Sequence, residues 1–322
     1  MRRCGEGRVT LTVGVDVGGT KVLAGVVTPD GEVLATVRRP TPSQDVHDTA
    51  RVIAEVVREL GEDYTIEAVG VGAAGWIDAS RSVVLHAPNL AWRREPLRDR
   101  IQERVDLPVV VENDANAAAW AEFRFGAGRD RPHLLLITVG TGIGGGAVVN
   151  GEVYRGEFGM AAEFGHVRVV PDGHPCGCGA SGCFEQYASG KALVRFARER
   201  ARNDPDDART LLEMAGGDVN AIDGPMVTRA AQAGDGVSLA SFSELGNWLG
   251  WGMADLVSAW DPRCIILGGG VAEAGDLLSI PARETYAKVT ALRGRTEAAE
   301  VRIAALGNKA GLVGAADLAR IR

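Results

Sequence analysis

The sequence predicts an α/β protein made of two domains. The chain has 322 residues, about twice the length of a typical single domain. Short β-rich apolar runs alternate with segments whose apolar residues recur at helical spacing, a pattern typical of α/β folds. The chain also contains 43 glycines, many of them clustered where the predicted strands end. Such clusters indicate places where backbone approaches backbone or a ligand closely.

Composition and charge narrow the class of protein. The chain is 46% apolar and 24% charged, as in an ordinary globular protein. A net charge of −7 argues against a nucleic-acid partner and against an anionic membrane surface. No apolar run approaches the ~20 residues of a membrane span, and none follows the basic start as in a signal peptide. We therefore expect a cytoplasmic protein, with Cys4 and Cys264 as spare thiols.

The first elements are two β-rich runs, LTVGVDV and VLAGVV, which predict a hairpin beginning at Leu11. Asp16 and the turn offer a carboxylate for a hydrated divalent ion, a hydroxyl and an ammonium beside backbone amides, as a phosphoryl-binding turn requires. A P-loop is excluded, because threonine stands where that motif demands lysine and a strand follows instead of a helix. The turn residues are Gly18, Gly19, Thr20 and Lys21.

The next segments predict a helix, a strand and a second helix. Apolar residues at helical spacing over 44–60 indicate an amphipathic helix that covers a sheet. The run EAVGVGAAG predicts a strand that ends in a turn containing Gly72 and Gly75. After a turn at Pro88 and Asn89, residues 90–105 predict a helix, with Trp92 in or near the core.

The run LPVVVEND predicts a strand ending at Glu112, after which a helix starts at once. Asn113 or Asp114 is thus placed as the helix N-cap, and capping alone would explain either residue. The functional alternative is that the carboxyl end of this strand presents both to a crevice, where open α/β sheets bind ligands. Asp114 could then accept a proton from a substrate hydroxyl that Asn113 orients.

A second hairpin is predicted from LLLITVG and GGAVVN, closing at Asn150 and Gly151. Gly140, Gly142 and Gly145 fit the dinucleotide pattern G-x-G-x-x-G, but a strand and not a helix is expected to follow, which disfavours a Rossmann site. The segments VDVGGT and ITVGTG align with each other. This faint repeat suggests two related halves that grip a phosphate chain from opposite sides through turn amides.

Segment 163–185 gathers four soft or borderline donors, His166, Cys176, Cys178 and Cys183, among several glycines. A Cys3His set suits tetrahedral zinc, and four protein ligands make the metal structural. The alternative is a disulfide or free thiols. A disulfide between Cys176 and Cys178 would be strained by their one-residue gap, and the expected compartment is reducing. His174 is a less favoured ligand, because it lies only two residues before Cys176.

Towards the C-terminus, residues 190–202 predict a helix whose basic outer face is most simply a solvated surface. Residues 238–259 predict a longer helix with core-facing tryptophans. The run CIILGGG predicts a buried strand followed by Gly268, Gly269 and Gly270, where a flat or phosphorylated ligand could approach; tight strand-to-helix packing is the alternative. An edge strand and an alanine-rich helix complete the chain.

Taken in order, the motifs DVGGTK, END, TVGTGIGGG, EFGH with CGCGASGCFE, LGGG and GLVGAA resemble the signatures of the ROK family of sugar kinases. They look most like those of its zinc-containing bacterial glucokinases. The match runs from about residue 13 to 316. Its most specific part is the cysteine cluster combined with Asp114.

The resemblance implies the actin-like ATPase (ribonuclease H-like) fold, with two domains around a cleft. The expected domains are a small one, 1–118 plus 310–322, and a large one, 119–309, that carries the zinc-binding loop 163–185. The implied activity is transfer of the ATP γ-phosphoryl group to the 6-hydroxyl of glucose, with Mg²⁺ and a structural Zn²⁺. A homodimer or homotetramer is expected.

The resemblance also implies roles for individual residues. Asp114 is similar to the family's catalytic base, Asp16 lies near the magnesium ion, and His166 with the three cysteines holds zinc. Ala73 and Ala74 depart from the G-x-P-G turn of many members, which affects the fit near the sugar. The implied sugar contacts are Gly75, Asn113, Asp114, Glu163, His166 and Glu185. The implied nucleotide contacts are Asp16, Gly18, Gly19, Thr20, Lys21, Thr138, Gly140, Thr141, Gly142, Gly268, Gly269, Gly270 and Gly311.

Other functions stay open at this point. Mannose, fructose, N-acetylglucosamine or N-acetylmannosamine could replace glucose, and polyphosphate could replace ATP. A non-catalytic sugar sensor is a second class, although only about ten residues precede the first strand, too few for the DNA-binding module of ROK repressors. A zinc-stabilised NAD-dependent oxidoreductase is disfavoured by the strand expected after Gly145.

Overall fold

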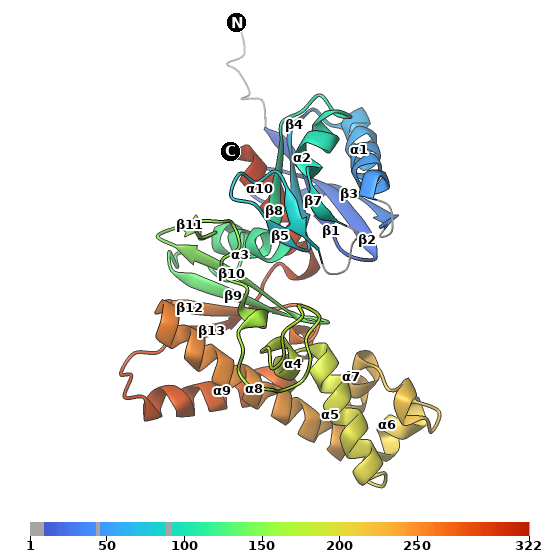
Figure 1. Ribbon diagram of the computed structural model, residues 1–322, viewed down its shortest axis with the longest axis vertical. Helices are drawn as coiled ribbons and strands as arrows, with labels where there is room; N and C mark the ends of the chain where they lie inside the picture. The colour runs from blue at the N-terminus through green and yellow to red at the C-terminus, as the bar shows by residue number, and fades with distance from the viewer. Residues whose placement is uncertain (1–9, 43–45, 88–91, 322) are drawn as a thin grey trace, which may run out of the picture. The chain divides into compact units, whose positions relative to one another are not determined.

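The computed structural model describes residues 10–42, 46–87 and 92–321 (Figure 1). The chain forms two compact units. The first comprises Met1–Asp130, Gly146–Ala162 and Ala305–Arg322, and the second comprises Arg131–Gly145 and Glu163–Ala304. The first unit therefore also takes in 119–130, 146–162 and 305–309, which the expected small domain leaves out. The expected domain limits stay a prediction.

The first unit is built on a five-stranded sheet with the order β3-β2-β1-β4-β8. The predicted first hairpin is confirmed, since β1 and β2 pair antiparallel up to Val17 opposite Val22. Strands β4 and β8 add to the other side of β1 in parallel. The strands are β1 Leu11–Val17, β2 Lys21–Val27, β3 Val33–Pro40, β4 Ile66–Ala73 and β8 Val109–Asn113.

Helices cover both faces of this sheet (Figure 1). On one face, α1 packs on β2 and β3, and α2 packs on β8. On the other face, the backbone of α10 lies directly against β1, because a Cβ placed on Gly14 would come within 1.9 Å of the Leu312 carbonyl oxygen. The predicted C-terminal helix is therefore buried in the first unit. The helices are α1 Val46–Asp63, α2 Leu97–Gln102, α3 Asp114–Phe125 and α10 Ala310–Arg320.

The helix expected over 90–105 is wrong in its first half. Residues Arg93–Glu95 form β7, which pairs with β6 (Val84–His86) and, through it, with β5 (Trp76–Ile77) in a small sheet. Pro96 then precedes α2, and the residue before a proline is disfavoured in helical conformation. Trp92 is buried as expected, with 1% exposure. The expected turn at Pro88 and Asn89, the helix start at 44 and Cys4 lie outside the described residues.

A second five-stranded sheet has the order β11-β10-β9-β12-β13, and its strands β10-β9-β12-β13 have the same connectivity as β2-β1-β4-β8. In each case a hairpin comes first. A later strand then pairs in parallel with the first strand of the hairpin, and a further strand pairs in parallel with that one. The faint internal repeat in the sequence thus corresponds to a repeated topology. The strands are β9 Leu134–Val139, β10 Ile143–Val149, β12 Cys264–Gly268 and β13 Glu300–Ile303.

The unit boundary falls within β10, whose last residues pair with β11 (Glu152–Val153) across Asn150 and Gly151. Both turn residues have positive φ, 55° and 80°, as a tight hairpin turn requires. A strand, and not a helix, follows the Gly140 turn, so the expected failure of the Rossmann pattern is confirmed.

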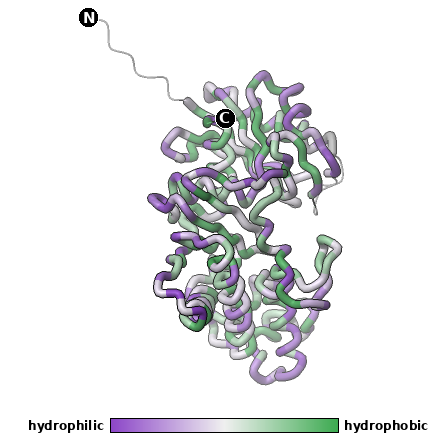
Figure 2. The backbone as a smooth tube through the Cα atoms, turned by 60° about the vertical axis from the view of Figure 1, so that its left-hand side comes forward, coloured by the Kyte–Doolittle hydropathy of each residue, from purple (hydrophilic) through white to green (hydrophobic). Residues whose placement is uncertain are grey.

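The helices of the second unit lie mostly after β10, and the longest pair, α8 and α9, pack along each other (Figure 1). Apolar segments run through the interior of each unit, and polar segments lie at the outer turns (Figure 2). Of the helices that the structure describes, none is both long and apolar enough to cross a bilayer. The main helices are α4 Glu185–Ala188, α5 Gly190–Asn203, α6 Arg209–Met214, α7 Gly224–Gln232, α8 Gly236–Trp260 and α9 Asp276–Leu292.

Candidate functional site

The carboxyl ends of three parallel strands in the first unit bring two carboxylates to one edge of the sheet. Asp16 of β1 lies beside Gly72 of β4, and Gly72 lies beside Glu112 of β8. Asp114 follows Glu112 by two residues, and a Cβ on Gly72 would be 3.7 Å from the Asp114 Cα. Strand register, which the sequence alone does not specify, thus places Asp16 and Asp114 at the same edge.

The structure shows which of Asn113 and Asp114 caps the helix α3. Asn113 is the N-cap of α3, since its side chain accepts a hydrogen bond from the Asn116 backbone N–H (3.0 Å). Its Nδ2 donates to the Gly75 carbonyl oxygen (3.0 Å), which ties the cap to the turn after β4. Asp114 Oδ1 accepts the Ala115 backbone N–H (2.9 Å). The cap is therefore explained by Asn113, and the carboxylate of Asp114 needs a different reason.

The electrostatics of this edge favour a proton acceptor. Burial, and to a smaller extent repulsion from Asp16, raise the pKa of the Asp114 carboxyl from its ordinary value of 3.8 to about 7. Burial also raises the pKa of Asp16, while the Lys21 ammonium opposes that change. A carboxyl whose pKa lies near neutrality is matched to the task of a general base.

The first glycine turn is held by a residue that sequence reasoning missed. The Gly18 backbone N–H donates to the Lys21 carbonyl oxygen (3.0 Å), which closes the turn. Thr41, just after β3, donates its hydroxyl to the Gly18 carbonyl (2.7 Å) and its N–H to the Thr20 carbonyl (3.1 Å). These bonds occupy the carbonyl oxygens, which would otherwise repel an anion at the turn. The edge strand β3, which ends at Pro40 just before Thr41, has a weak alternating pattern, so the role of Thr41 was not visible in the sequence.

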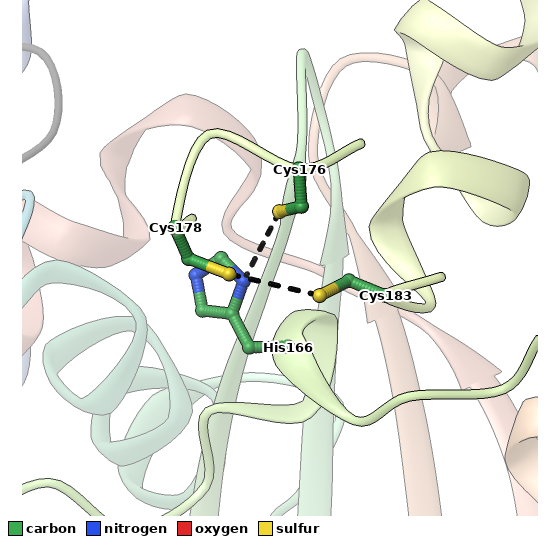
Figure 3. A group of neighbouring side chains, drawn as sticks. All are labelled: His166, Cys176, Cys178 and Cys183. Carbon is green, nitrogen blue, oxygen red and sulfur yellow. Dashed lines mark hydrogen bonds between the residues drawn. The ribbon is translucent and has the colours of Figure 1, made fainter. Parts of the chain in front are cut away.

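In the second unit, His166, Cys176, Cys178 and Cys183 point towards one another (Figure 3). Their ligand atoms all lie within 4.8 Å of each other. Cys176 Sγ lies 3.7 Å from His166 Nδ1, and Cys178 Sγ lies 3.7 Å from Cys183 Sγ. Ligands about 2.3 Å from a tetrahedral centre are ~3.8 Å apart, so both pairs fit a four-coordinate metal.

The disulfide alternative is not formed. The sulfurs of Cys178 and Cys183 are 3.7 Å apart, far longer than the ~2.05 Å of a disulfide bond, and the three cysteines of the loop are free thiols. The ring of His174 lies instead against that of Tyr187, with centroids 5.4 Å apart. His166 is thus the histidine of the cluster, and these four residues could hold a metal ion.

Glu185 connects the cysteine cluster with the second glycine turn. Its Oε1 accepts a hydrogen bond from the Cys176 thiol (3.0 Å). A Cβ on Gly142 would lie 2.5 Å from its Oε2, so a larger residue at this position would displace the carboxylate. Glu163 accepts the His166 backbone N–H at its carbonyl oxygen (3.0 Å) and leads into the short helix η1 (Phe164–His166). The loop, its two glutamates and the turn are therefore packed as one region.

A cavity of about 1150 Å³ lies in the second unit beside the ends of β9 and β12. These strands are parallel, with Gly268 opposite Thr138, so their carboxyl-end turns meet. The Val271 N–H donates to the Val139 carbonyl (2.9 Å), and the Gly190 N–H donates to the Gly140 carbonyl (2.8 Å). The two glycine turns and the start of α5 thus form one wall of the cavity.

The remaining walls combine cations with apolar side chains. The basic face of α5, expected to be a solvated surface, lines this cavity instead. The reason is that α7 and the segment before it fold over that face, a long-range contact that periodicity does not reveal. The basic lining residues are Lys191, Arg195, Arg198, Arg202 and Arg229, and the apolar ones include Ile222, Pro225, Val271 and Ala274.

The predicted nucleotide contacts are divided between the units. Asp16 and the turn of Gly18 to Lys21 belong to the first unit, whereas the turns at Gly140 and Gly270 belong to the second. Gly311 does not join the cavity, because it lies in the first unit, where its Cβ would be 3.5 Å from the Asp16 Cγ.

The fold and site together define a class of protein: a two-unit α/β protein with glycine turns at the carboxyl ends of its strands and a carboxyl group whose pKa is raised to about 7. Comparison with known families makes this specific, because residues 12–322 match the ROK family. The chain belongs to the ROK family. The resemblance inferred from the motifs is therefore confirmed.

Relatives of known identity cover nearly the whole chain. A glucokinase of Streptomyces coelicolor is 50% identical over 310 residues, which is 96% of this chain and 98% of the relative. The crystal structure of a ROK family glucokinase from Streptomyces griseus, in complex with glucose and AMPPNP, superimposes with a TM-score of 0.89 at 51% identity, covering 97% of this chain and 100% of that one. A ROK hexokinase from Thermus thermophilus gives a TM-score of 0.80 at 37% identity, covering 97% and 98%. The expected actin-like ATPase fold is confirmed by these structures.

Proposed function

We propose that this protein is an ATP-dependent glucokinase, which transfers the γ-phosphoryl group of ATP to the 6-hydroxyl of glucose. The observation that carries the proposal is the full-length similarity to a glucokinase whose crystal structure contains glucose and AMPPNP. The carboxylate edge of the first unit and the cavity of the second supply the parts that this reaction needs.

Asp114 is the general base of the proposed mechanism. Its ionised carboxylate takes the proton of the sugar 6-hydroxyl, the oxygen attacks the γ-phosphorus, and the bond to the bridging oxygen breaks to release ADP. The pKa of about 7 supports this role, because the carboxylate is then basic enough to accept the proton while about half of it is ionised at neutral pH. We assign the sugar hydroxyls to Gly75, Asn113, Glu163, His166 and Glu185, all of which are polar or expose backbone groups.

The phosphate chain is assigned to the backbone amides of two glycine turns, 18–21 and 138–142, and to the ammonium group of Lys21. Asp16 would hold Mg²⁺, which neutralises charge on the phosphate oxygens. ATP is preferred over polyphosphate as the donor because the cavity has an apolar wall, including Ile222, Pro225 and Val271, that suits an adenine ring. A polyphosphate chain would leave that wall exposed to water.

The four-residue cluster is assigned to structural zinc, and the two distances of 3.7 Å support this choice. Zinc would hold the loop in one geometry. The backbone hydrogen bond from the His166 N–H to the Glu163 carbonyl, and the position of Glu185 two residues after Cys183, would then hold both glutamates in advance of sugar binding. Prearranged acceptors lose less conformational entropy when the sugar binds.

Cellular setting and assembly complete the proposal. We assign the protein to the cytoplasm, as a homodimer or homotetramer that phosphorylates glucose at the entry to glycolysis. The acidic composition and the free thiols of the cluster support a reducing compartment. Light scattering of the purified protein measures the assembly.

A substrate panel tests the proposal. ADP release is measured with glucose, mannose, fructose, N-acetylglucosamine and N-acetylmannosamine, and phosphorylated product is measured with ATP or polyphosphate as donor. We expect the highest kcat/KM with glucose and ATP. Equal or better turnover of another sugar would reassign the substrate. No turnover with any sugar, combined with tight sugar binding, would identify a non-catalytic sensor instead.

A further inference from the structure

We infer that Glu112 is a positioning residue for the catalytic edge, acting through an ion-pair network with Arg81 and Arg155. The inference rests on the proposed role of Asp114 as the base. All of the residues involved belong to the first unit.

One carboxylate oxygen of Glu112 holds the junction between β8 and α3. Glu112 Oε1 accepts the backbone N–H of Asn113 (3.1 Å) and the side-chain Nδ2 of Asn116 (3.2 Å). Asn113 is the residue immediately before Asp114, and Asn116 lies two residues after it, in the first turn of the helix that Asp114 begins. The oxygen therefore restrains the chain on both sides of the proposed base.

The other oxygen is bound by two arginines from distant parts of the sequence. Arg155 approaches Glu112 Oε2 with Nη2 at 2.7 Å and Nε at 2.8 Å, and Arg81 Nε lies 3.3 Å away. The side chain of Glu112 is only 3% exposed. A buried carboxylate needs charged or hydrogen-bonding partners on both oxygens, and the arginines supply them at Oε2 while Oε1 holds the β8–α3 junction.

Capping of the helix α3 does not by itself explain the network of Glu112, Arg81 and Arg155. Asn113 already caps α3 with its own side chain, and it reaches Gly75 with its Nδ2. Arg81 contacts β8 twice, because its carbonyl oxygen accepts the Val111 N–H (3.1 Å) while its side chain pairs with Glu112. Gly75, Arg81 and Arg155, from three separate segments, thus all contact residue 112 or 113, next to Asp114.

The geometry explains why such bracing matters for turnover. Asp114 sits at the first position of a helix, so a small rotation of the β8–α3 junction displaces its carboxylate relative to a bound hydroxyl. A displacement of about 1 Å costs roughly a hundredfold in rate in such reactions. Sugar binding is shared with Glu163, His166 and Glu185, which lie outside this junction, whereas proton transfer depends on Asp114 alone, so we expect a much larger effect on kcat than on KM.

The test compares two buried acids of the first unit. Glu112→Gln keeps the size of the side chain but weakens its acceptors. Asp317→Asn is the matched control, since Asp317 is 1% exposed and is held by Trp120, Arg124 and Arg320, away from the strand edge. For Glu112→Gln we expect kcat to fall about a hundredfold, with KM for glucose and ATP and the calorimetric Kd for glucose within threefold. For Asp317→Asn we expect kcat within threefold of the parent protein.

Equal kcat values for the two variants would overturn the inference, because the loss would then follow from burial alone. If Glu112→Gln does not fold, Arg155→Lys decides the question with Arg320→Lys as its control; only the first should lower kcat, by about tenfold. Asp114→Asn is measured in parallel. Full activity of Asp114→Asn would refute the proposed base, whereas an inactive Asp114→Asn beside a fully active Glu112→Gln would refute only the positioning role.

Discussion

Replacing Asp114 by asparagine should remove activity and at the same time stabilise the protein. The folded protein raises the pKa of this carboxyl from 3.8 to about 7, so ionisation is less favourable in the folded state than in the unfolded one. A difference of about three pH units corresponds to about 4 kcal/mol of unfolding free energy. The neutral amide avoids this cost and can still accept the Ala115 N–H.

The sign of this effect defines its pH window. Below pH 3.8 the carboxyl is protonated in both states, so the parent protein and the variant differ little. As the pH rises towards 7, the unfolded chain ionises while the folded protein retains its proton, and the parent protein loses stability. The advantage of Asp114→Asn should therefore grow from pH 4 to 7 and level off at about 4 kcal/mol above pH 7.

Two measurements on the same preparations test this reasoning. Denaturant unfolding at a series of pH values gives the stability difference, and an assay of ADP release with glucose gives kcat. We expect kcat to fall by at least about a hundredfold, because the general base is lost, while glucose still binds. A variant that is less stable than the parent at pH 8, or that retains most of its turnover, would refute the electrostatic account of this residue.

Two further predictions concern the second unit. Cys178→Ala should lower the zinc content, measured by mass spectrometry, and reduce activity, because three ligands hold the metal and the loop less firmly than four. Cys264→Ala, away from the cluster, is the control. Full activity without zinc would show that the site does not need the metal. Lys191→Ala should raise KM for ATP roughly tenfold at unchanged KM for glucose, because the cavity loses a cation next to the Gly140 turn; Lys288→Ala on α9 is the control, and an unchanged KM for ATP would place the phosphates elsewhere.

Those parts of the site whose residues are close together in the chain could be predicted from the sequence. The cysteine cluster spans 163–185, so spacing and ligand chemistry alone indicated one metal and a closed coordination shell. The two hairpins were also predictable, because each depends on a short glycine turn between two apolar runs. The edge strand β3 was missed, since its exposed face has no continuous apolar pattern.

By itself, the sequence determined the α/β class, the cluster of possible metal ligands and the presence of Asp114 at the end of a strand, because these depend on local spacing and periodicity. Only the tertiary structure decided which groups meet. Strand register placed Asp16 next to Gly72, at the carboxyl end of β4. The packing of α7 makes the basic face of α5 part of the lining of a cavity. The tertiary structure also brought Arg81 and Arg155 onto Glu112, and it set the pKa of Asp114 through burial. Such features arise from contacts between residues far apart in the chain, which no local pattern of amino acids encodes.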